Sequence, residues 1–203
     1  MYLETISYGI LDSNCYIIGD AGSAAVVDAG ANDSEILRVL NSQGLNLEYI
    51  ILTHAHIDHV LEAGKLREAT GAKIVIHEDD ALLLGDPALN CSALFGPNKV
   101  FGPADILVKD CDTLNIGGIR LRFIHTPGHT PGSMCVLAER RLFSGDTLFR
   151  LGVGRTDLGA GNQTKLEESV RRLMELDDST EVFPGHGPAT DIGFEKRNNP
   201  FIL

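Results

Sequence analysis

The chain has 203 residues, 43% of them apolar, and this length supports one well-buried core rather than two independent domains. We therefore expect a single domain over residues 1–203. The chain carries 28 acidic and 17 basic residues, a net charge of −11, and its Lys and Arg residues are scattered. Because nucleic-acid binding requires clustered basic residues, we expect no nucleic-acid partner.

Localisation and redox state follow from the N-terminal residues, the apolar runs and the cysteines. The sequence begins MYLE, without the basic and apolar regions of a signal peptide, and no segment reaches the roughly 20 apolar residues of a membrane helix. We expect a cytoplasmic protein with no membrane partner. Cys15, Cys91, Cys111 and Cys135 are widely separated and form no CxxC pair, which favours reduced thiols. The sequence does not indicate an oligomeric state.

Short apolar runs bounded by turn residues predict strands, and amphipathic segments between them predict helices. In the first half, strands are expected at residues 15–18, 24–27, 49–52 and 74–76, and helices at residues 34–42 and 60–69. Residues 85–103, rich in glycine and proline and without periodicity, predict a long loop. In the second half, strands are expected at residues 119–124, 133–137, 141–143 and 181–183, and a helix at residues 166–176.

An apolar strand enters a histidine-bearing loop twice, in YIILTHAHIDH (residues 49–59) and in RFIHTPGHT (residues 122–130). Two β-rich halves that each deliver polar side chains to a shared sheet edge would explain this faint repeat. The first loop holds three of the chain's seven histidines and an aspartate within six residues. His54 and His56 point the same way on extended backbone, while Asp58 and His59 lie where the chain turns into a helix. Imidazole and carboxylate ligands suit zinc, iron or manganese, so this cluster predicts a metal site.

Three later glycine-rich turns each carry one ligand-type residue beside an apolar strand: His129 in TPGHTPG, Asp146 in FSGDTLF and His186 in FPGHGPA. With the first cluster, these turns supply more ligands than one tetrahedral ion needs. Two metal ions that share Asp146 as a bridge would use all seven residues. His77 and His125 are not needed for this set, and we predict a structural or supporting role for them.

These segments together make the sequence resemble the metallo-β-lactamase superfamily and, within it, the glyoxalase II-like hydrolases. The matching segments are VVDAG (26–30), THAHIDH (53–59), HTPGHTPGS (125–133), SGDTLF (144–149), GRTDL (154–158), PGHGPAT (184–190) and NPF (199–201). The resemblance covers nearly the whole chain. It implies an α/β fold, an αββα sandwich of two mixed sheets flanked by helices, with metal ions at the sheet edges.

The resemblance also implies a role for each candidate residue. It assigns the first metal ion to His54, His56 and His129, the second to Asp58, His59 and His186, and the bridge to Asp146. Asp28 is implied to orient a ligand without binding metal itself. Two divalent ions are therefore expected, with zinc as the first choice and iron or manganese as alternatives.

Differences between this sequence and other groups of the superfamily narrow the choice of enzyme class. The lactamases place cysteine where this chain has Asp146, and the flavodiiron oxygen reductases place glutamate where it has His56. Superfamily nucleases add RNA-binding elements that this sequence does not match. The long glyoxalase II enzymes continue past NPF into a helical domain that binds glutathione. The chain is thus similar to the short glyoxalase II type, with no C-terminal helical domain.

The expected chemistry is hydrolysis of a small-molecule thioester. Two metal ions polarise a carbonyl and activate water. The ligand set leaves no spare carboxylate as a general acid, but a thiolate leaves without protonation. Asp58 is the carboxylate that could also direct the nucleophile, and the resemblance implies S-D-lactoylglutathione as the substrate. Arg155 is a candidate anchor for a substrate carboxylate, with a surface ion pair to Asp157 as the alternative.

Two other functions stay open from the sequence. A persulfide dioxygenase of this superfamily binds one iron through two histidines and a carboxylate, which His54, His129 and Asp146 would supply. A non-catalytic metal-binding module would retain the ligands without turnover. The 85–103 loop, which contains Leu, Phe and Pro, is expected to cover the metal edge, with a disordered insertion as the alternative.

Overall fold

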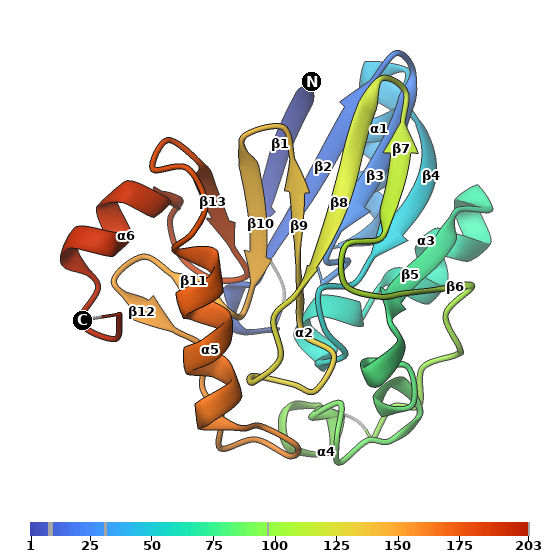
Figure 1. Cartoon of the computed structure of the whole chain (residues 1–203). Coiled ribbons are helices and arrows are strands. Elements are labelled where there is room, and N and C mark those ends of the chain that lie inside the picture. Colours follow the sequence, from blue (N-terminus) through green and yellow to red (C-terminus); the bar gives the residue numbers. More distant parts are fainter. Residues whose placement is uncertain (8–9, 31, 97, 203) are drawn as a thin grey trace.

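The computed structural model describes residues 1–7, 10–30, 32–96 and 98–202. Two six-stranded sheets pack face to face, and helices lie on their outer sides (Figure 1). The first sheet comes from the blue to green part of the chain, and the second from the yellow to red part. This arrangement confirms the predicted αββα sandwich.

The first sheet has the strand order β1-β2-β3-β4-β5-β6. Its strands are β1 (Tyr2–Ser7), β2 (Asn14–Asp20), β3 (Ser23–Val27), β4 (Asn46–Ile51), β5 (Lys73–His77) and β6 (Ile106–Val108). β2 is antiparallel to both β1 and β3, and from β3 onward each strand is parallel to its neighbour. The sheet is therefore mixed, and β4 lies in its parallel part, where the ends of several strands share one edge.

The second sheet has the order β14-β13-β10-β9-β8-β7. Its strands are β7 (Thr113–Ile116), β8 (Ile119–His125), β9 (Met134–Ala138), β10 (Arg141–Gly145), β13 (Glu181–Pro184) and β14 (Thr190–Asp191). β10 and β13 are parallel, and the other neighbours are antiparallel. A small hairpin, β11 (Leu148–Phe149) and β12 (Gly152–Val153), follows β10.

The helices of the described chain are mostly short. They are α1 (Asp33–Gln43), α2 (Ile57–Val60), α3 (Ala63–Thr70), α4 (Ser92–Phe95), α5 (Gln163–Leu173) and α6 (Ile192–Asn198), with 3-10 turns η1 (Ile10–Asp12), η2 (Glu78–Asp80) and η3 (Leu83–Gly85). The side chain of Asn32 accepts from the Ser34 N–H and caps α1, which ends at Gly44 in the left-handed conformation. None of the described helices has both the length and the apolar character needed to cross a bilayer.

Alternating side chains along the strands build three apolar clusters. In β2, Tyr16 and Ile18 face the opposite sheet and pack with Phe143, whereas Cys15 and Ile17 pack toward α1 and α3. A third cluster lies between the second sheet and helices α5 and α6. Because both faces of the central strands are buried, their sequences read as continuous apolar runs.

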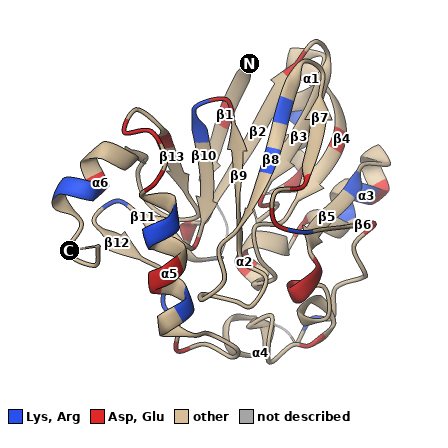
Figure 2. Cartoon of the chain, in the orientation of Figure 1, with Lys and Arg blue, Asp and Glu red and all other residues tan. Residues whose placement is uncertain are grey.

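The predicted elements are present with shifted boundaries, and several others were missed. The helix expected at residues 60–69 is two helices, and α2 starts early enough to include Asp58 and His59. The loop expected at residues 85–103 contains the short helix α4, and its residue 97 lies outside the described residues. Strands β1, β6, β7, β11, β12 and β14 and helix α6 were not predicted. Basic residues are dispersed over β8, β10, α3, α5 and α6 in the view of Figure 2.

Candidate metal centre

All seven predicted ligands meet at one edge of the sandwich, where strands of both sheets end. The turn after β4 supplies His54 and His56, and α2 supplies Asp58 and His59. The turns after β8, β10 and β13 supply His129, Asp146 and His186. Strand ends that share an edge therefore bring together residues up to 132 positions apart, from His54 to His186.

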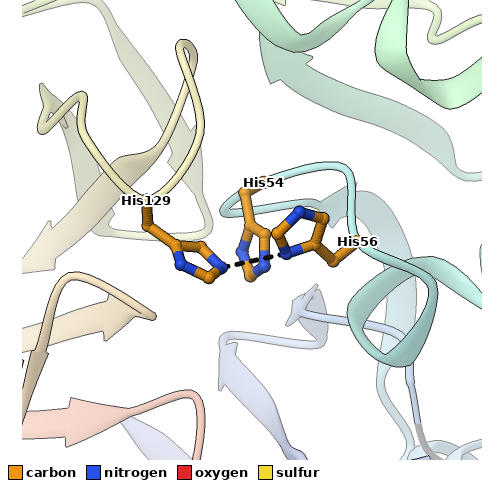
Figure 3. Close-up of side chains that lie close together, drawn as sticks. All are labelled: His54, His56 and His129. Carbon is orange, nitrogen blue, oxygen red and sulfur yellow. Dashed lines mark hydrogen bonds between the residues drawn. The ribbon is translucent and has the colours of Figure 1, made fainter. Parts of the chain in front are cut away.

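Three of these histidines form what we call the three-histidine group: His54, His56 and His129. One nitrogen from each ring lies within 4.8 Å of the others. The three rings converge in Figure 3, where a dashed line marks the 2.9 Å between His129 Nε2 and His56 Nδ1. Each ring is almost completely buried. The spacing suits a single ion held by three imidazole nitrogens.

The other group, which we call the aspartate group, consists of Asp58, His59 and His186. Asp58 Oδ2 lies 3.1 Å from His186 Nε2 and 3.3 Å from His59 Nε2. The two histidine Nε2 atoms are 3.3 Å apart. These three ligand atoms could surround a second ion.

Asp146 lies between the two groups. Its Oδ2 is 3.6 Å from His129 Nε2 in the three-histidine group and 3.6 Å from His186 Nε2 in the aspartate group. Its Oδ1 is 3.5 Å from His59 Nε2 and has no hydrogen-bond partner among the described residues. This position is the one that a bridging carboxylate requires.

Acceptors outside the centre bind the Nδ1–H of three of its histidines. His129 Nδ1–H donates to the carbonyl of Arg155 at 2.7 Å, and His186 Nδ1–H donates to that of Leu11 at 3.1 Å. His59 Nδ1–H donates to Asp28 Oδ2 at 2.9 Å. Each of these bonds directs Nε2 of the ring inward, where it can bind metal once it is deprotonated.

His54 follows the same pattern through its neighbour Thr53. The Thr53 hydroxyl donates to Asp28 Oδ2 at 2.8 Å, so its oxygen accepts from His54 Nδ1–H at 3.1 Å. His54 Nε2 is buried and lacks a hydrogen-bond partner in the described chain. Buried acceptor atoms without a donor, such as His54 Nε2 and Asp146 Oδ1, are costly unless a cation occupies the space beside them. The residues present therefore fit metal ions.

The electrostatics of the two groups differ. Burial opposes protonation of His59 and His186, but Asp58 and the neighbouring carboxylates outweigh it and raise the pKa of both histidines, so a bound cation would displace protons there. Burial and the neighbouring histidines lower the pKa of His54, and burial with His129 lowers the pKa of His56 to about 3. These imidazoles are neutral, which is the state that ligates metal. Burial also opposes ionisation of Asp58, but His59 and His186 outweigh it and hold the pKa of Asp58 well below its usual value.

Asp28 is buried directly behind the centre. Its carboxylate accepts from the Thr53 N–H and the Thr53 hydroxyl, both at 2.8 Å, and from His59. Asp28 itself has a positive φ of 59°, an uncommon conformation for a non-glycine residue. The family resemblance implied an orienting role for Asp28. The geometry matches that role, because one carboxylate binds the backbone and hydroxyl of Thr53 and the ligand His59.

A cavity of about 360 Å³ opens onto both groups. Its walls contain His56, Asp58, His129, Asp146 and His186, together with Leu11, Cys91, Phe95, Phe149, Val153, Arg155 and Leu158. Cys91 and Phe95 come from the 85–103 segment, so part of this segment borders the metal edge, as expected for a cover.

Arg155 lies at the wall of this cavity with its side chain 57% exposed. Its guanidinium donates to both carboxylate oxygens of Asp157, at 2.6 and 2.7 Å. The structure thus contains the ion pair that was the alternative to a substrate anchor, on a residue that also borders the cavity. Its backbone carbonyl has a further role that sequence reasoning missed, because it orients His129.

His77 and His125 form a separate stack, with ring centroids 3.8 Å apart and planes inclined by 12°. Asp79 lies 3.9 Å from a nitrogen of each ring. His77 Nδ1 accepts from the Asp79 N–H, and His125 Nε2–H donates to the Pro131 carbonyl. Nearly parallel rings cannot both direct in-plane lone pairs at one ion between them, so this geometry agrees with the predicted structural role.

The sequence is similar to proteins of one family over almost its entire length. Residues 8–186 match the family described as the Metallo-beta-lactamase superfamily. An uncharacterized protein of Mycobacterium leprae is 40% identical over 219 residues, which cover 100% of this chain and 99% of that protein. The hydroxyacylglutathione hydrolase GloC of Haemophilus influenzae is 34% identical over 208 residues, which cover 100% of this chain and 98% of that protein.

Solved structures give the same family. The B3 metallo-beta-lactamase BLEG-1 superposes with a TM-score of 0.94 at 36% identity, and the match covers 100% of both chains. TTHA1623 in a di-iron-bound form has a TM-score of 0.85 at 33% identity and covers 98% of this chain and 99% of its own. ETHE1 from Myxococcus xanthus has a TM-score of 0.83 at 31% identity, covering 98% of this chain and 84% of its own. Fold, ligand geometry and sequence agree, and the chain belongs to the metallo-β-lactamase superfamily.

Proposed function

We propose that this protein is a dinuclear, metal-dependent hydrolase of acyl thioesters. The observation that carries the proposal is the pair of ligand groups on one cavity, with the Asp146 carboxylate between them. Two bound divalent ions would polarise the acyl carbonyl and lower the pKa of the attacking water. Zinc is the first choice, and the similarity to a di-iron-bound structure supports iron as an alternative.

The chain's own residues supply orientation and proton handling. Asp58 borders the cavity, and its pKa lies well below its usual value, so it is ionised and can orient the attacking water by accepting a hydrogen bond from it. The described residues that line the cavity include no carboxyl group beyond Asp58 and Asp146, both assigned to metal. No carboxyl group among these residues is therefore free to protonate a leaving group, and a thiolate can leave without being protonated.

S-D-lactoylglutathione or a similar acyl thioester is the proposed substrate. The support is the 34% identity to a protein named hydroxyacylglutathione hydrolase, over the whole chain. The apolar wall, which includes Leu11, Phe149 and Val153, suits the acyl and thiol carbon atoms. Arg155 is proposed to meet a substrate carboxylate at the cavity rim, which requires it to exchange its bond to Asp157.

A second candidate activity is oxygen-dependent oxidation of a persulfide by one iron. The similarity to ETHE1 favours it, and His54, His129 and Asp146 would supply the two-histidine, one-carboxylate ligand set. The thioesterase proposal uses all seven converging residues, whereas the mononuclear site uses three of them. Because the chain is similar to the B3 metallo-beta-lactamase BLEG-1, a β-lactam is included among the test compounds. The sequence has Asp146 where a cysteine is expected in lactamases.

The test combines a metal count with a substrate panel. The protein is loaded with zinc or with iron and assayed on S-D-lactoylglutathione, a small neutral thioester, a β-lactam and, by oxygen uptake, glutathione persulfide. We expect two ions per chain and thioester hydrolysis as the fastest reaction. One ion per chain with oxygen uptake, or faster β-lactam turnover, would reject the proposal.

A further inference from the structure

Asp80 is a buried carboxylate with no place in either ligand group. It ends the turn η2 after β5 and is 0% exposed. Its Oδ2 accepts from the Ala55 N–H at 3.0 Å and from the Thr130 hydroxyl at 2.8 Å, and its Oδ1 accepts from the Gly132 N–H at 2.6 Å. Three donors therefore satisfy a carboxylate that would otherwise be costly to bury.

The positions of these donors relate Asp80 to the metal centre. Ala55 stands between His54 and His56, and Thr130 directly follows His129. The first loop ends a strand of one sheet, and the second loop follows a strand of the other. A single carboxylate thus binds the backbone on both sides of the three-histidine group.

The contact leaves little room for movement. A Cβ atom on Gly132 would lie 2.5 Å from the Asp80 nitrogen and 2.8 Å from Asp80 Oδ1, so only glycine fits there. The Thr130 hydroxyl also lies 2.7 Å from Ser133 Oγ, which accepts from the Thr130 N–H at 3.0 Å. The loop that carries His129 is consequently held in one conformation against Asp80.

We propose that Asp80 is a positioning residue that sets the distance between the loop of His54 and His56 and the loop of His129. It thereby determines the affinity of the three-histidine group for metal. Asp28 contacts His59 of the aspartate group, which Asp80 does not touch, and reaches the three-histidine group only through Thr53 and His54. The inference rests on the metal-binding part of the proposed function and is independent of which substrate is hydrolysed.

The test compares Asp80→Asn with Asp79→Asn and Asp28→Asn. An Asn side chain at position 80 presents an amide N–H to one or more of the three donors, so it loses hydrogen bonds without leaving a cavity. Zinc affinities of both groups are measured by chelator competition, and NMR of the histidine rings shows which rings bind at each step. Loss of a supporting hydrogen bond of this kind typically lowers metal affinity about 10–100-fold, and we expect a loss of this order for Asp80→Asn.

We expect Asp80→Asn to weaken zinc binding at the His56 and His129 rings while His59 and His186 fill as in the wild type. Asp28→Asn should weaken binding at the His59 ring, which Asp80→Asn leaves unchanged, and at His54 through Thr53. Asp79→Asn should match the wild type. Thr130→Val, which removes one donor, is a milder second variant with a smaller loss in the same direction. The unfolding midpoint of each metal-free variant reports whether the fold is intact.

The outcomes separate the two proposals. Equal affinities in the wild type and Asp80→Asn, or an equal loss at both groups with a lowered metal-free midpoint, would overturn the positioning role. A wild type that binds two zinc ions but hydrolyses no thioester would reject the proposed substrate class and leave the role of Asp80 intact.

Discussion

Among the described residues, four of the five histidines at the centre have a hydrogen-bond partner outside the ligand set for their other ring nitrogen. His129 and His186 donate to backbone carbonyls, of Arg155 and Leu11, whereas His59 donates to the Asp28 carboxylate. Hydrogen bonds of this type fix the ring orientation and raise the basicity of the ligand nitrogen. At the residue scale, the metal site therefore depends on loop conformation as much as on ligand identity.

Replacement of Asp146 by Ala should remove one metal ion or both and abolish turnover. Without the carboxylate between His129 and His186, two cations at short range would repel each other with no bridging negative charge between them. Metal analysis and steady-state kinetics of the variant check this prediction. An Asp146→Ala protein that keeps two ions and near-normal kcat would contradict the dinuclear arrangement.

Replacement of Arg155 by Ala should raise KM for S-D-lactoylglutathione about tenfold and leave kcat nearly unchanged, because a remote charge-assisted contact is common to ground and transition states. A small neutral thioester should be unaffected. Asp157→Asn is the matched variant: it releases the guanidinium from its present partner and should lower KM for the anionic substrate. An equal effect of Arg155→Ala on both substrates would assign this residue to the surface alone.

At the scale of elements, the seven ligand positions and one support, Asp28, could be predicted, and the other supports could not. Histidine and aspartate at fixed spacing after an apolar strand are a specific signal, and the structure brings all of them together. Asp80 lies in HEDD, where nothing distinguishes it from the exposed Asp79. The carbonyls of Leu11 and Arg155 leave no trace in side-chain chemistry. Metal binding itself stays a prediction.

The missed elements share a physical reason. β1 is an edge strand whose residues are exposed or half-buried, so it lacks the apolar run that identified β2 and β3. β6 and β14 have three and two residues, too few for a periodic pattern. The split between α2 and α3 was missed because apolar periodicity continues across Leu61 and Glu62. Central strands are thus readable from sequence, and edges are not.

Asp110 ties the turn between β6 and β7 to helix α5 and should make stability depend on acid pH. Both its oxygens accept from Arg172 at 2.9 Å, and Oδ1 also accepts from the His125 N–H. Burial opposes ionisation, but these bonds outweigh it and bring the pKa of Asp110 to about 2. Because this lies below the unfolded value of about 3.9, the stabilisation is complete above pH ~4 and is lost as pH falls toward 2.

The measurement is denaturant or thermal unfolding of Asp110→Asn beside the wild type from pH 7 to pH 3. Since the pair is partly exposed, Tm should fall by no more than about 3 °C at pH 7, with the difference shrinking below pH ~4. Glu68→Gln, at an exposed position on α3, controls for the loss of one negative charge. A difference that stays constant across this pH range would refute the role of the ionised carboxylate.

At the scale of the whole molecule, bound metal would join the two halves of the sandwich. The three-histidine group and the aspartate group each take ligands from both sheets, His129 and His186 being those of the second. Removal of metal with a strong chelator should therefore lower the stability of the entire fold rather than one loop. A ligand at about 1,000 times its Kd stabilises by about 4 kcal/mol, so a loss of Tm on the order of 10 °C is expected.

Calorimetry of the metal-loaded and the chelated protein checks this expectation, and stoichiometric zinc should restore the original Tm. His125→Gln, outside both groups, should respond to the chelator as the wild type does. Two separate transitions after chelation would mean that the sheets unfold independently, and an unchanged Tm would mean that metal contributes nothing to the fold.

The order of the strands has a consequence for how the protein is made. β1–β6 precede β7–β14 without interleaving, so a growing chain can complete its first sheet before any strand of the second has left the ribosome. The inner face of that sheet, with Ile18, Val27 and Val75, is then not covered by the second sheet. The ligands in THAHIDH are translated before the ligands of the second half. The nascent first half therefore exposes an apolar face and an incomplete set of metal ligands. Its exposure to aggregation and to chaperones ends only when β8 to β10 emerge and cover that face.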